Sequence, residues 1–229
     1  MRWTIGCALM LLLAGAVAAQ EAVTPPDPRN PVGENLATPS DWRVRLDAPD
    51  PDVVVGDDQE TADIWFVNMT PGWHVTTGPR AIFWHPGLAA AGAWRAEATI
   101  HLFDPGERDE AFGIFFGGRD LEGDGIAYDY FVLRNSGELL IKRRRGSETE
   151  VIRDWTPHEA IATFGPESES SVENVLAVEV REESVTFSVN GAVVATLPRA
   201  ELATDGHVGL RLNHHLNVHV SDLSVSSSR

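Results

Sequence analysis

Short segments in which apolar and polar residues alternate fill the chain from Ile64 onward. Successive side chains of a strand point to opposite sides, so a two-residue period is typical of strands with one buried face. The stretches 94–102 and 184–189 follow this period closely. Their apolar positions are Trp94, Ala96, Ala98, Ile100, Leu102, Val185, Phe187 and Val189. The pattern predicts sheet, not helix.

Turn residues separate these segments at the spacing that hairpins need. Asn190-Gly191 suits the positive φ angles of a tight type I′ turn, and the runs Asn135-Ser136-Gly137 and Arg145-Gly146-Ser147 are similar. The turns predict a meander of strands over residues 126–134, 138–144 and 149–155, and a hairpin over 175–197. Single helical turns are expected only at Pro157–Ile161 and Arg199–Ala203. Many short strands with almost no helix predict an all-β fold, a sandwich or a barrel.

The N-terminal residues predict export. Arg2 precedes an apolar run from Ile5 to Val17 that ends in small residues, which is typical of a signal peptide over residues 1–19 cleaved after Ala19. An uncleaved anchor is the alternative, but the run is short for a bilayer, so no stable membrane insertion is expected after cleavage. We therefore expect a periplasmic or secreted protein. Cys7 is the only cysteine, so the mature chain contains no disulfide and depends on its core.

Composition divides the rest of the chain into two parts. Residues 20–40 contain five prolines and few large apolar side chains, which predicts a flexible leader. Residues 41–229 then form a single β-sandwich domain. Acidic residues outnumber basic ones 34 to 18. Such a surface repels a phosphate backbone, which excludes nucleic acid as a partner, and it weakly favours cations or neutral glycans over anionic polymers.

Two groups of segments resemble a known superfamily. The first is Tyr130–Arg134, Leu139–Arg144 and Asp154–Thr156. The second runs from Asn174 to Arg211 and contains the pattern N-x-L-x-V, F-x-V-N-G and G-x-V-G-L. Both are similar to laminin-G-like domains of the concanavalin A-like lectin/glucanase superfamily. Over residues 64–225 the resemblance implies an antiparallel β-sandwich of the concanavalin A-like jelly-roll type.

The resemblance leaves several functions open. The superfamily includes lectins, glucanases, a bacterial group named after 3-keto-disaccharide hydrolysis, and binding modules without activity, and fold analogy does not choose among them. Laminarinase-like glucanases of this fold carry Glu-x-Asp-x-x-Glu on one strand, and this sequence contains no such segment. That departure counts against an ordinary retaining glucanase, which needs two facing carboxylates.

Two features suggest metal ions as cofactors. Asp120–Gly125 has the alternating oxygens of a Ca²⁺ loop, but Phe131 stands where an EF-hand needs a bidentate Glu, so a polar turn is the stronger interpretation. Histidines could bind Zn²⁺ or transfer protons. If the C-terminal segment is one strand, five polar residues share one of its faces: His207, Arg211, Asn213, His215 and His219. Ordinary surface histidines, or a turn at His214-His215, are the alternative.

Aromatic and basic residues suggest a ligand surface. Trp73-His74 and Trp84-His85 repeat a motif in strands expected to be neighbours, and Tyr128, Tyr130 and Trp155 add further rings. Sugar rings stack on such side chains, although core packing is the commoner role, above all for Trp94. The basic run Lys142–Arg145 alternates between two faces, so pairing with Asp129, Glu148 and Glu150 is its default explanation.

These observations support an exported, non-catalytic, lectin-like module that binds a glycan. The first alternative is a glycoside-cleaving enzyme of the 3-keto-disaccharide hydrolase-like type, with histidines and Glu97 as acid, base or metal ligands. The second is a sandwich that docks on another exported protein. The candidate ligand-binding residues are Trp73, His74, Trp84, His85, Glu97, His101, Tyr128, Arg134 and His215.

Overall fold

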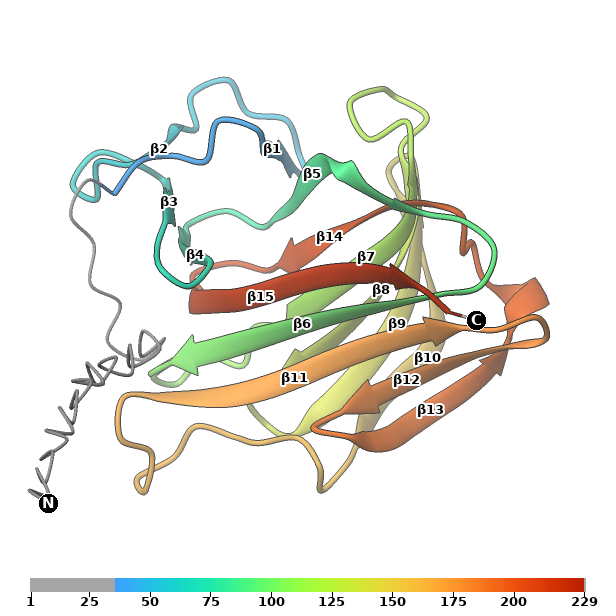
Figure 1. Cartoon of the computed structure of the whole chain (residues 1–229). Helices are drawn as coiled ribbons and strands as arrows, with labels where there is room; N and C mark the ends of the chain where they lie inside the picture. Colours follow the sequence, from blue (N-terminus) through green and yellow to red (C-terminus); the bar gives the residue numbers. More distant parts are fainter. Residues whose placement is uncertain (1–35, 229) are drawn as a thin grey trace, which may run out of the picture.

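Two β-sheets packed face to face make up the part of the chain that the computed structural model describes, residues 36–228. In Figure 1 the layer containing β15, β6, β11, β12 and β13 lies in front of the layer containing β14, β7, β8, β9 and β10. The predicted signal peptide and most of the predicted leader lie outside the described residues. The all-β sandwich predicted from the alternating pattern is confirmed.

The first sheet has seven strands, and all of its neighbours pair antiparallel. Its strands, in spatial order, are β1 (Arg43–Leu46), β5 (Ala81–Ala90), β14 (Gly206–Leu212), β7 (Phe112–Arg119), β8 (Ala127–Arg134), β9 (Glu138–Arg145) and β10 (Glu148–Pro157). The last three strands are the meander predicted from the turn residues.

The second sheet has eight strands, of which only β2 and β3 pair in parallel. Its strands, in spatial order, are β13 (Ala192–Pro198), β12 (Ser184–Val189), β11 (Ser171–Val180), β6 (Trp94–Phe103), β15 (Asn217–Ser227), β4 (Trp73–Thr77), β3 (Ile64–Asn68) and β2 (Val55–Gly56). The second predicted hairpin falls within strands β11, β12 and β13. Asn190 and Gly191 form the turn between β12 and β13, with φ of 51° and 82°.

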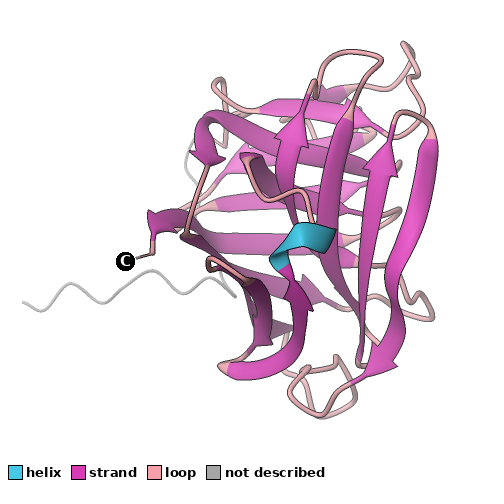
Figure 2. Ribbon diagram, turned by 90° about the vertical axis from the view of Figure 1, so that its right-hand side faces the viewer, coloured by secondary structure: helices cyan, strands magenta, loops and turns pink. Residues whose placement is uncertain are grey.

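Within residues 36–228, helix is confined to one 3₁₀ turn, η1 (Arg199–Glu201), the short cyan segment in Figure 2. This agrees with the helical turn predicted at Arg199–Ala203. The turn predicted at Pro157–Ile161 is not helical, because Pro157 ends β10 and turn and irregular residues follow it. Because β10 is an edge strand, Pro157 can lack a backbone N–H on the side without a neighbouring strand, and no inter-strand hydrogen bond is lost there.

The core between the sheets follows the alternation along each strand. The apolar positions of β6, from Trp94 to Leu102, are each at most 1% exposed, whereas Arg95 and Glu97 point away from the core. Burying one large apolar side chain contributes roughly 1.5–3 kcal/mol, so these strands are held mainly by their apolar faces. The core position predicted for Trp94 is confirmed.

The segment before β1 also contacts the sandwich. The backbone N–H of Asn68 donates to the carbonyl oxygen of Ala37 at 2.8 Å, and Pro39 is buried. The N–H of Thr38 donates to Oδ2 of Asp57 at 3.3 Å. Residues 36–40, which the proline content assigned to the leader, therefore pack against the second sheet.

Candidate functional site

The outer face of the seven-stranded sheet carries its own apolar cluster, separate from the core between the sheets. Side chains from β5, β7, β8 and β9 form it, with two from the β7–β8 loop and one from the residue before β7. Its members are Ile82, Trp84, Ala111, Phe115, Leu121, Ile126, Tyr128, Tyr130, Val132 and Leu140, with Trp155 packed against them. The ten cluster residues are each at most 8% exposed, so other parts of the chain cover most of this face, and a ligand could reach it only through the cavities beside it.

Close packing at Gly209 keeps one of these rings in place. A Cβ at this position would lie 2.5 Å from the Phe115 ring and 2.2 Å from the carbonyl oxygen of Phe83. Only glycine leaves room for Phe115 to lie across β14. The G-x-V-G-L segment noted in the sequence therefore shapes the floor of the outer face.

A cavity of about 410 Å³ opens above this cluster. Tyr130, Val132 and Leu140 contribute its apolar part, and polar and charged side chains surround them. Its full lining is Asp47, Arg80, Ala111, Tyr130, Val132, Leu140, Lys142, Arg144, Ser147, Thr149, Trp155, Arg211 and Asn213. Apolar surface with a few convergent polar groups is the usual composition of a small-molecule site.

Irregularity in β10 brings Trp155 into this lining. The pairing of β10 with β9 shifts register between Val151 and Arg153 and again between Arg153 and Thr156. Such bulges change the direction of the side chains next to them. The Arg134 guanidinium carbon lies 4.1 Å from the centroid of the Trp155 ring, a cation–π contact that holds the indole.

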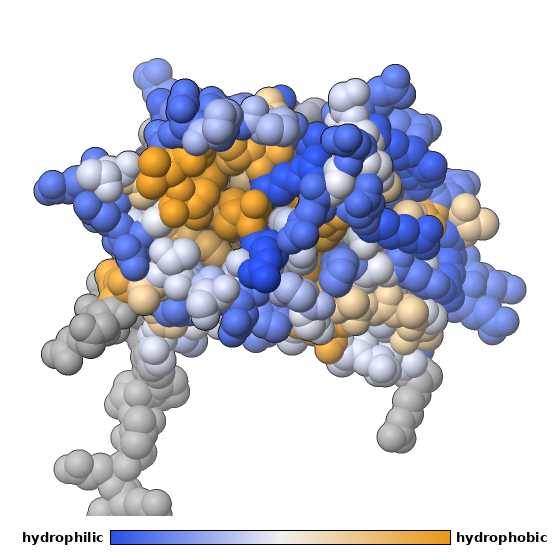
Figure 3. Space-filling model, turned by 90° about the horizontal axis from the view of Figure 1, so that it is seen from above, coloured by the Kyte–Doolittle hydropathy of each residue, from blue (hydrophilic) through white to orange (hydrophobic). Residues whose placement is uncertain are grey.

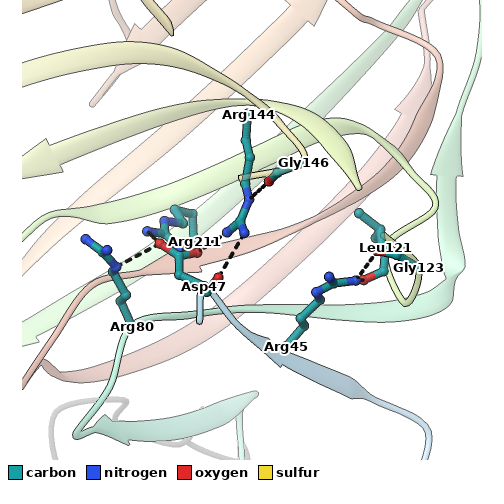
Figure 4. Close-up of polar contacts among 8 residues, drawn as sticks. All are labelled: Arg45, Asp47, Arg80, Leu121, Gly123, Arg144, Gly146 and Arg211. Atoms are coloured by element: carbon teal, nitrogen blue, oxygen red, sulfur yellow. Dashed lines mark hydrogen bonds and ion pairs between the residues drawn. The ribbon is translucent and has the colours of Figure 1, made fainter. Parts of the chain in front are cut away.

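Asp47 is bound by three arginines from three different elements (Figure 4). Arg211 on β14 donates to both carboxylate oxygens, at 2.6 and 2.7 Å. Arg144 on β9 donates to Oδ1 at 2.6 Å, and Nε of Arg80 lies 2.8 Å from Oδ2. Because Asp47 directly follows β1, these contacts fasten the end of an edge strand over the outer face.

Charge and burial set the protonation of this cluster. Burial raises the pKa of Asp47, but the hydrogen bond and charge of Arg211 and the charges of Arg144 and Arg80 outweigh it and hold the pKa below its ordinary value. Burial raises the pKa of Tyr130 to about 12. At neutral pH the carboxylate is therefore ionised, and the phenol keeps its proton.

Arg45 fixes the loop that was considered for Ca²⁺. Its Nη1 donates to the carbonyl oxygens of Leu121 and Gly123, each at 2.7 Å, and the N–H of Gly125 donates to Oδ2 of Asp120 at 2.8 Å. Two loop carbonyls therefore already accept hydrogen bonds from a cation of the protein. Within residues 36–228, no group of three or more His, Cys, Asp or Glu side chains is arranged to hold a metal ion.

A second hollow of about 550 Å³ lies beside this loop, lined partly by Val44, Leu46, Trp84 and Leu121. Seen from above, the side of the molecule where β1 and β2 lie shows an apolar patch bordered by hydrophilic side chains (Figure 3). Charged side chains also line this hollow, but their signs nearly balance, unlike those around Asp47; they are Arg43, Arg45, Asp50, Glu122 and Asp124.

Three of the predicted ligand-binding residues lie on the outer face of the seven-stranded sheet. Trp84 and Tyr128 are buried in its apolar cluster, at 4% and 1% exposed. Arg134 supports Trp155 and also pairs with Glu138 and Asp109. None of the three lines the cavity around Asp47, whereas Trp84 lines the second hollow.

Three others lie on the outer face of the eight-stranded sheet. His74 and His101 are in register with His219 from its two sides, and the ring centroids are 6.0 and 5.9 Å from that of His219. Nε2 of His74 lies 2.6 Å from Oδ1 of Asn217. Glu97 pairs with Arg95 on the same face.

The remaining three candidates are scattered. Trp73 packs on Trp42 with ring centroids 4.7 Å apart, and Nδ1 of His85 accepts a hydrogen bond from the N–H of Gly87 at 3.0 Å. His215 is exposed with φ of 50° in the turn between β14 and β15. That turn is the alternative considered for His214-His215, and it is confirmed.

Two assumptions about neighbouring strands are wrong. Trp73-His74 and Trp84-His85 lie on β4 and β5, which follow one another in the chain but belong to different sheets. The last histidines do not share one strand, since His207 lies on β14 in the first sheet and His219 on β15 in the second. Strand parity is local, whereas the choice of sheet depends on long-range pairing.

The central residues of the cavity were missed as a group. Tyr130 pairs with Lys142, and Tyr128 pairs with Arg144, across β8 and β9. The patterns Tyr-x-Tyr and Lys-x-Arg on paired strands are therefore a signal that could have placed these four side chains on one face. Asp47 and Arg80 lie outside the recognised strand patterns, and nothing in their local sequence indicates that they meet.

Searches with the sequence find no relatives: no family model matches the chain, and no curated protein matches it. Similarity appears only at the level of structure. The carbohydrate-binding module CBM66 from Bacillus subtilis superposes with a TM-score of 0.54 at 10% identity, over 71% of this chain and 91% of the module.

Two further solved structures resemble the chain at this level. A Bacteroides ovatus mixed linkage glucan GH16 protein, solved with a product bound, has a TM-score of 0.53 at 10% identity, over 87% of this chain and 98% of that protein. A Bacillus subtilis protein of unknown function with a galectin-like fold has a TM-score of 0.51 at 11% identity, over 82% and 89%. The chain thus has the concanavalin A-like lectin/glucanase fold.

Proposed function

We propose that this protein is an exported, non-catalytic carbohydrate-binding protein whose ligand occupies the cavity around Tyr130 and Trp155. The observation that carries the proposal is the lining of this cavity, which combines aromatic rings with charged and polar hydrogen-bonding groups on one open sheet face. Its volume of about 410 Å³ falls in the range of small-ligand sites.

The chemistry of a saccharide fits this lining. One face of a sugar ring is apolar and packs on an aromatic side chain, while its hydroxyl groups need hydrogen-bonding partners. Trp155 offers an indole whose orientation Arg134 fixes, and Asn213, Ser147 and Thr149 supply neutral polar groups along the lining. Such a site binds with few changes of conformation, because the rings are already held.

The fold comparison adds support of a general kind. CBM66 is named a carbohydrate-binding module, and the Bacteroides ovatus GH16 protein was solved with a product. At about 10% identity these similarities concern the fold alone. Export is proposed from the N-terminal residues, which lie outside the described part. Within the described residues, no helix has the length and apolar character to span a membrane.

The lining favours binding over glycoside hydrolysis. Hydrolysis by the common mechanisms needs two carboxyl groups on either side of the scissile bond. Asp47 is the one carboxylate among the residues that line the cavity, and three arginines bind it. Glu97, the acid of the enzyme alternative, lies on the other sheet. The histidines of that alternative are not part of the lining either.

Replacement of Trp155 by alanine tests the proposal. Loss of one stacking aromatic costs roughly 0.5–1.5 kcal/mol, so we expect affinity for a glycan identified on an array to fall by up to about tenfold. Isothermal titration calorimetry measures the affinity, and Trp155→Phe, which keeps a ring, should restore most of it. Val151→Ala is the matched control, because Val151 is exposed on the same strand and does not line the cavity.

Three results would contradict parts of the proposal. Wild-type protein that binds no glycan on the array would refute carbohydrate binding and leave protein docking as the leading alternative. Release of reducing ends from a bound glycan would show an enzyme. The protein is to be expressed with its N-terminal residues, so that its mass also shows whether cleavage occurs after Ala19; an intact N-terminus would contradict the signal peptide.

A further inference from the structure

The charge of the cavity is opposite to that of the chain. Lys142, Arg80, Arg144 and Arg211 are cations in its lining, and Asp47 is its one carboxylate, so the lining carries a net charge of +3. The whole chain carries −16. The composition alone favoured cations or neutral glycans as ligands, but the charge around the cavity is a local property that composition does not reveal.

Asp47 accounts for only part of this positive charge. Its Oδ1 accepts from Arg211 and Arg144, and its Oδ2 contacts Arg211 and Arg80, so both oxygens are fully engaged. One carboxylate neutralises one of the guanidinium groups. A structural role therefore explains why three arginines meet there, but it leaves two positive charges without a counterion.

Two polar groups in the lining are left over. Arg211 is 4% exposed, and its Nε has no hydrogen-bond partner in the described structure. Lys142 is half-buried, and no ion pair or hydrogen bond of its ammonium group is found within residues 36–228. Buried or half-buried charge without a partner is costly, and an anionic ligand group would remove that cost.

These cations lie next to the aromatic surface. Lys142 is in register with Tyr130 on the neighbouring strand, and the Arg211 guanidinium carbon lies 5.6 Å from the centroid of the Tyr130 ring. A sugar unit over Tyr130 would therefore have its substituents close to both cations. Charge-assisted hydrogen bonds to a carboxylate or sulfate are roughly twice as strong as neutral ones.

We propose that the cavity binds an anionic saccharide, a sugar unit with a carboxylate or sulfate group that lies against Lys142 and Arg211. This inference rests on the proposed carbohydrate-binding function and names its ligand class. Lys142 supplies a compact charge and determines the preference for acidic over neutral sugars. Arg211 holds Asp47 and adds positive charge beside the ligand.

The test compares ligands that differ only in charge. Uronic acid trisaccharides and their methyl esters are titrated into the wild-type protein, with neutral and sulfated oligosaccharides and poly-L-glutamate alongside. One charge-assisted contact is worth about 1.5 kcal/mol, so the acid should bind about tenfold more tightly than its ester. Lys142→Gln should reduce this ratio to about twofold, whereas Arg145→Gln, the same charge change on the same strand outside the cavity, should leave it unchanged.

Each outcome distinguishes this inference from the function on which it rests. If the acid and its ester bind with equal affinity and binding still depends on Trp155, the inference of an anionic ligand is wrong and the proposed carbohydrate binding stands. No binding of any saccharide overturns both. Preference for sulfated sugars that Lys142→Gln abolishes supports the anion site and identifies sulfate as its source. A further outcome is that poly-L-glutamate binds as tightly as the acidic sugar and loses this binding in Lys142→Gln. That result would overturn the proposal of a saccharide ligand and leave only a site for anions.

Discussion

The outer faces of the two sheets both bury polar side chains, but they treat charge in opposite ways. On the seven-stranded sheet, Asp47 and Arg211 stay ionised, because opposite charges lie within hydrogen-bonding distance. On the eight-stranded sheet, His219 lies between His74 and His101, and burial and the two neighbouring imidazoles lower its pKa to about 4. Its ring is neutral at pH 7.

The difference teaches what a buried polar row requires. An ion pair in a partly buried site survives only when geometry and partners offset its desolvation. Three guanidinium groups meet this condition for Asp47. For His219, burial and the two neighbouring imidazoles lower the pKa, so its uncharged form prevails at pH 7. The first face keeps a surplus of positive charge, on which the proposed anionic ligand depends, whereas His219 carries no charge at pH 7.

The largest effect is expected from Asp47→Asn. The change removes the carboxylate and leaves Arg211, which is 4% exposed, beside Arg144 without its counterion. Breaking such a pair costs about 3 kcal/mol, and urea unfolding followed by tryptophan fluorescence should show a loss of this size. Asp52→Asn, at an exposed position, is the control and should change stability by less than about 0.5 kcal/mol. A small effect at both positions would show that the arginine cluster needs no carboxylate.

A smaller effect is expected from acid on the histidine face. His219 has a pKa of about 4 in the folded protein and about 6.5 when unfolded, so the unfolded chain takes up the proton first as pH falls. Stability is complete above pH 6.5 and decreases by about 2 kcal/mol between pH 7 and pH 5. Asp47 behaves differently, because its pKa is lowered in the folded protein. Its ionised form stabilises the fold at any pH above the ordinary pKa of an aspartate, and that stability is lost only in stronger acid.

Replacing His219 separates the two pH ranges. In His219→Gln the decrease between pH 7 and pH 5 should become smaller, with a remainder from His74, whose pKa burial also lowers, while the loss in stronger acid remains. His215→Asn is the matched control, since His215 is exposed and asparagine tolerates its φ of 50°. Its pH profile should match that of the wild type. An unchanged slope in His219→Gln, measured by urea unfolding at each pH, would mean that His219 titrates normally in the folded protein.

The smallest effect is expected from Lys142→Gln in the absence of ligand. Lys142 makes no ion pair within the described residues, so its replacement should shift the unfolding free energy by at most about 0.5 kcal/mol. Together with Asp47→Asn, this variant separates charges that hold the face together from charges that remain available. A loss comparable to that of Asp47→Asn in thermal or urea unfolding would show that Lys142 is structural.

Most strands were predictable from the sequence, because alternation and turn chemistry are local. The meander β8–β9–β10 and the hairpin at Asn190-Gly191 lie within a few residues of their predicted positions. The alternation also gave the two faces of β6 correctly, with Trp94 in the core and Glu97 outside. The helical turn expected at Pro157–Ile161 failed because Pro157 ends the edge strand and turn and irregular residues follow it.

Less of the candidate site was predictable. Trp84, Tyr128 and Arg134 were chosen for their residue type and lie on the correct sheet face, although beneath or beside the cavity. His74, His101 and Glu97 lie on the other sheet, and the alternation of apolar and polar residues does not show which strands belong to which sheet. A residue's face within its strand is encoded locally, but the sheet to which that strand belongs is not.

The sequence by itself therefore determined the class of fold, the order of most strands and which side chains of each strand face the core. Only the tertiary structure brought Asp47 within 2.6 Å of a guanidinium 164 residues further along the chain. It also placed a positively charged cavity on an acidic protein. The physical reason is that alternation depends on neighbours two residues apart, whereas the cavity depends on which strands pair and on long side chains that converge from β9, β14 and the segment between β4 and β5.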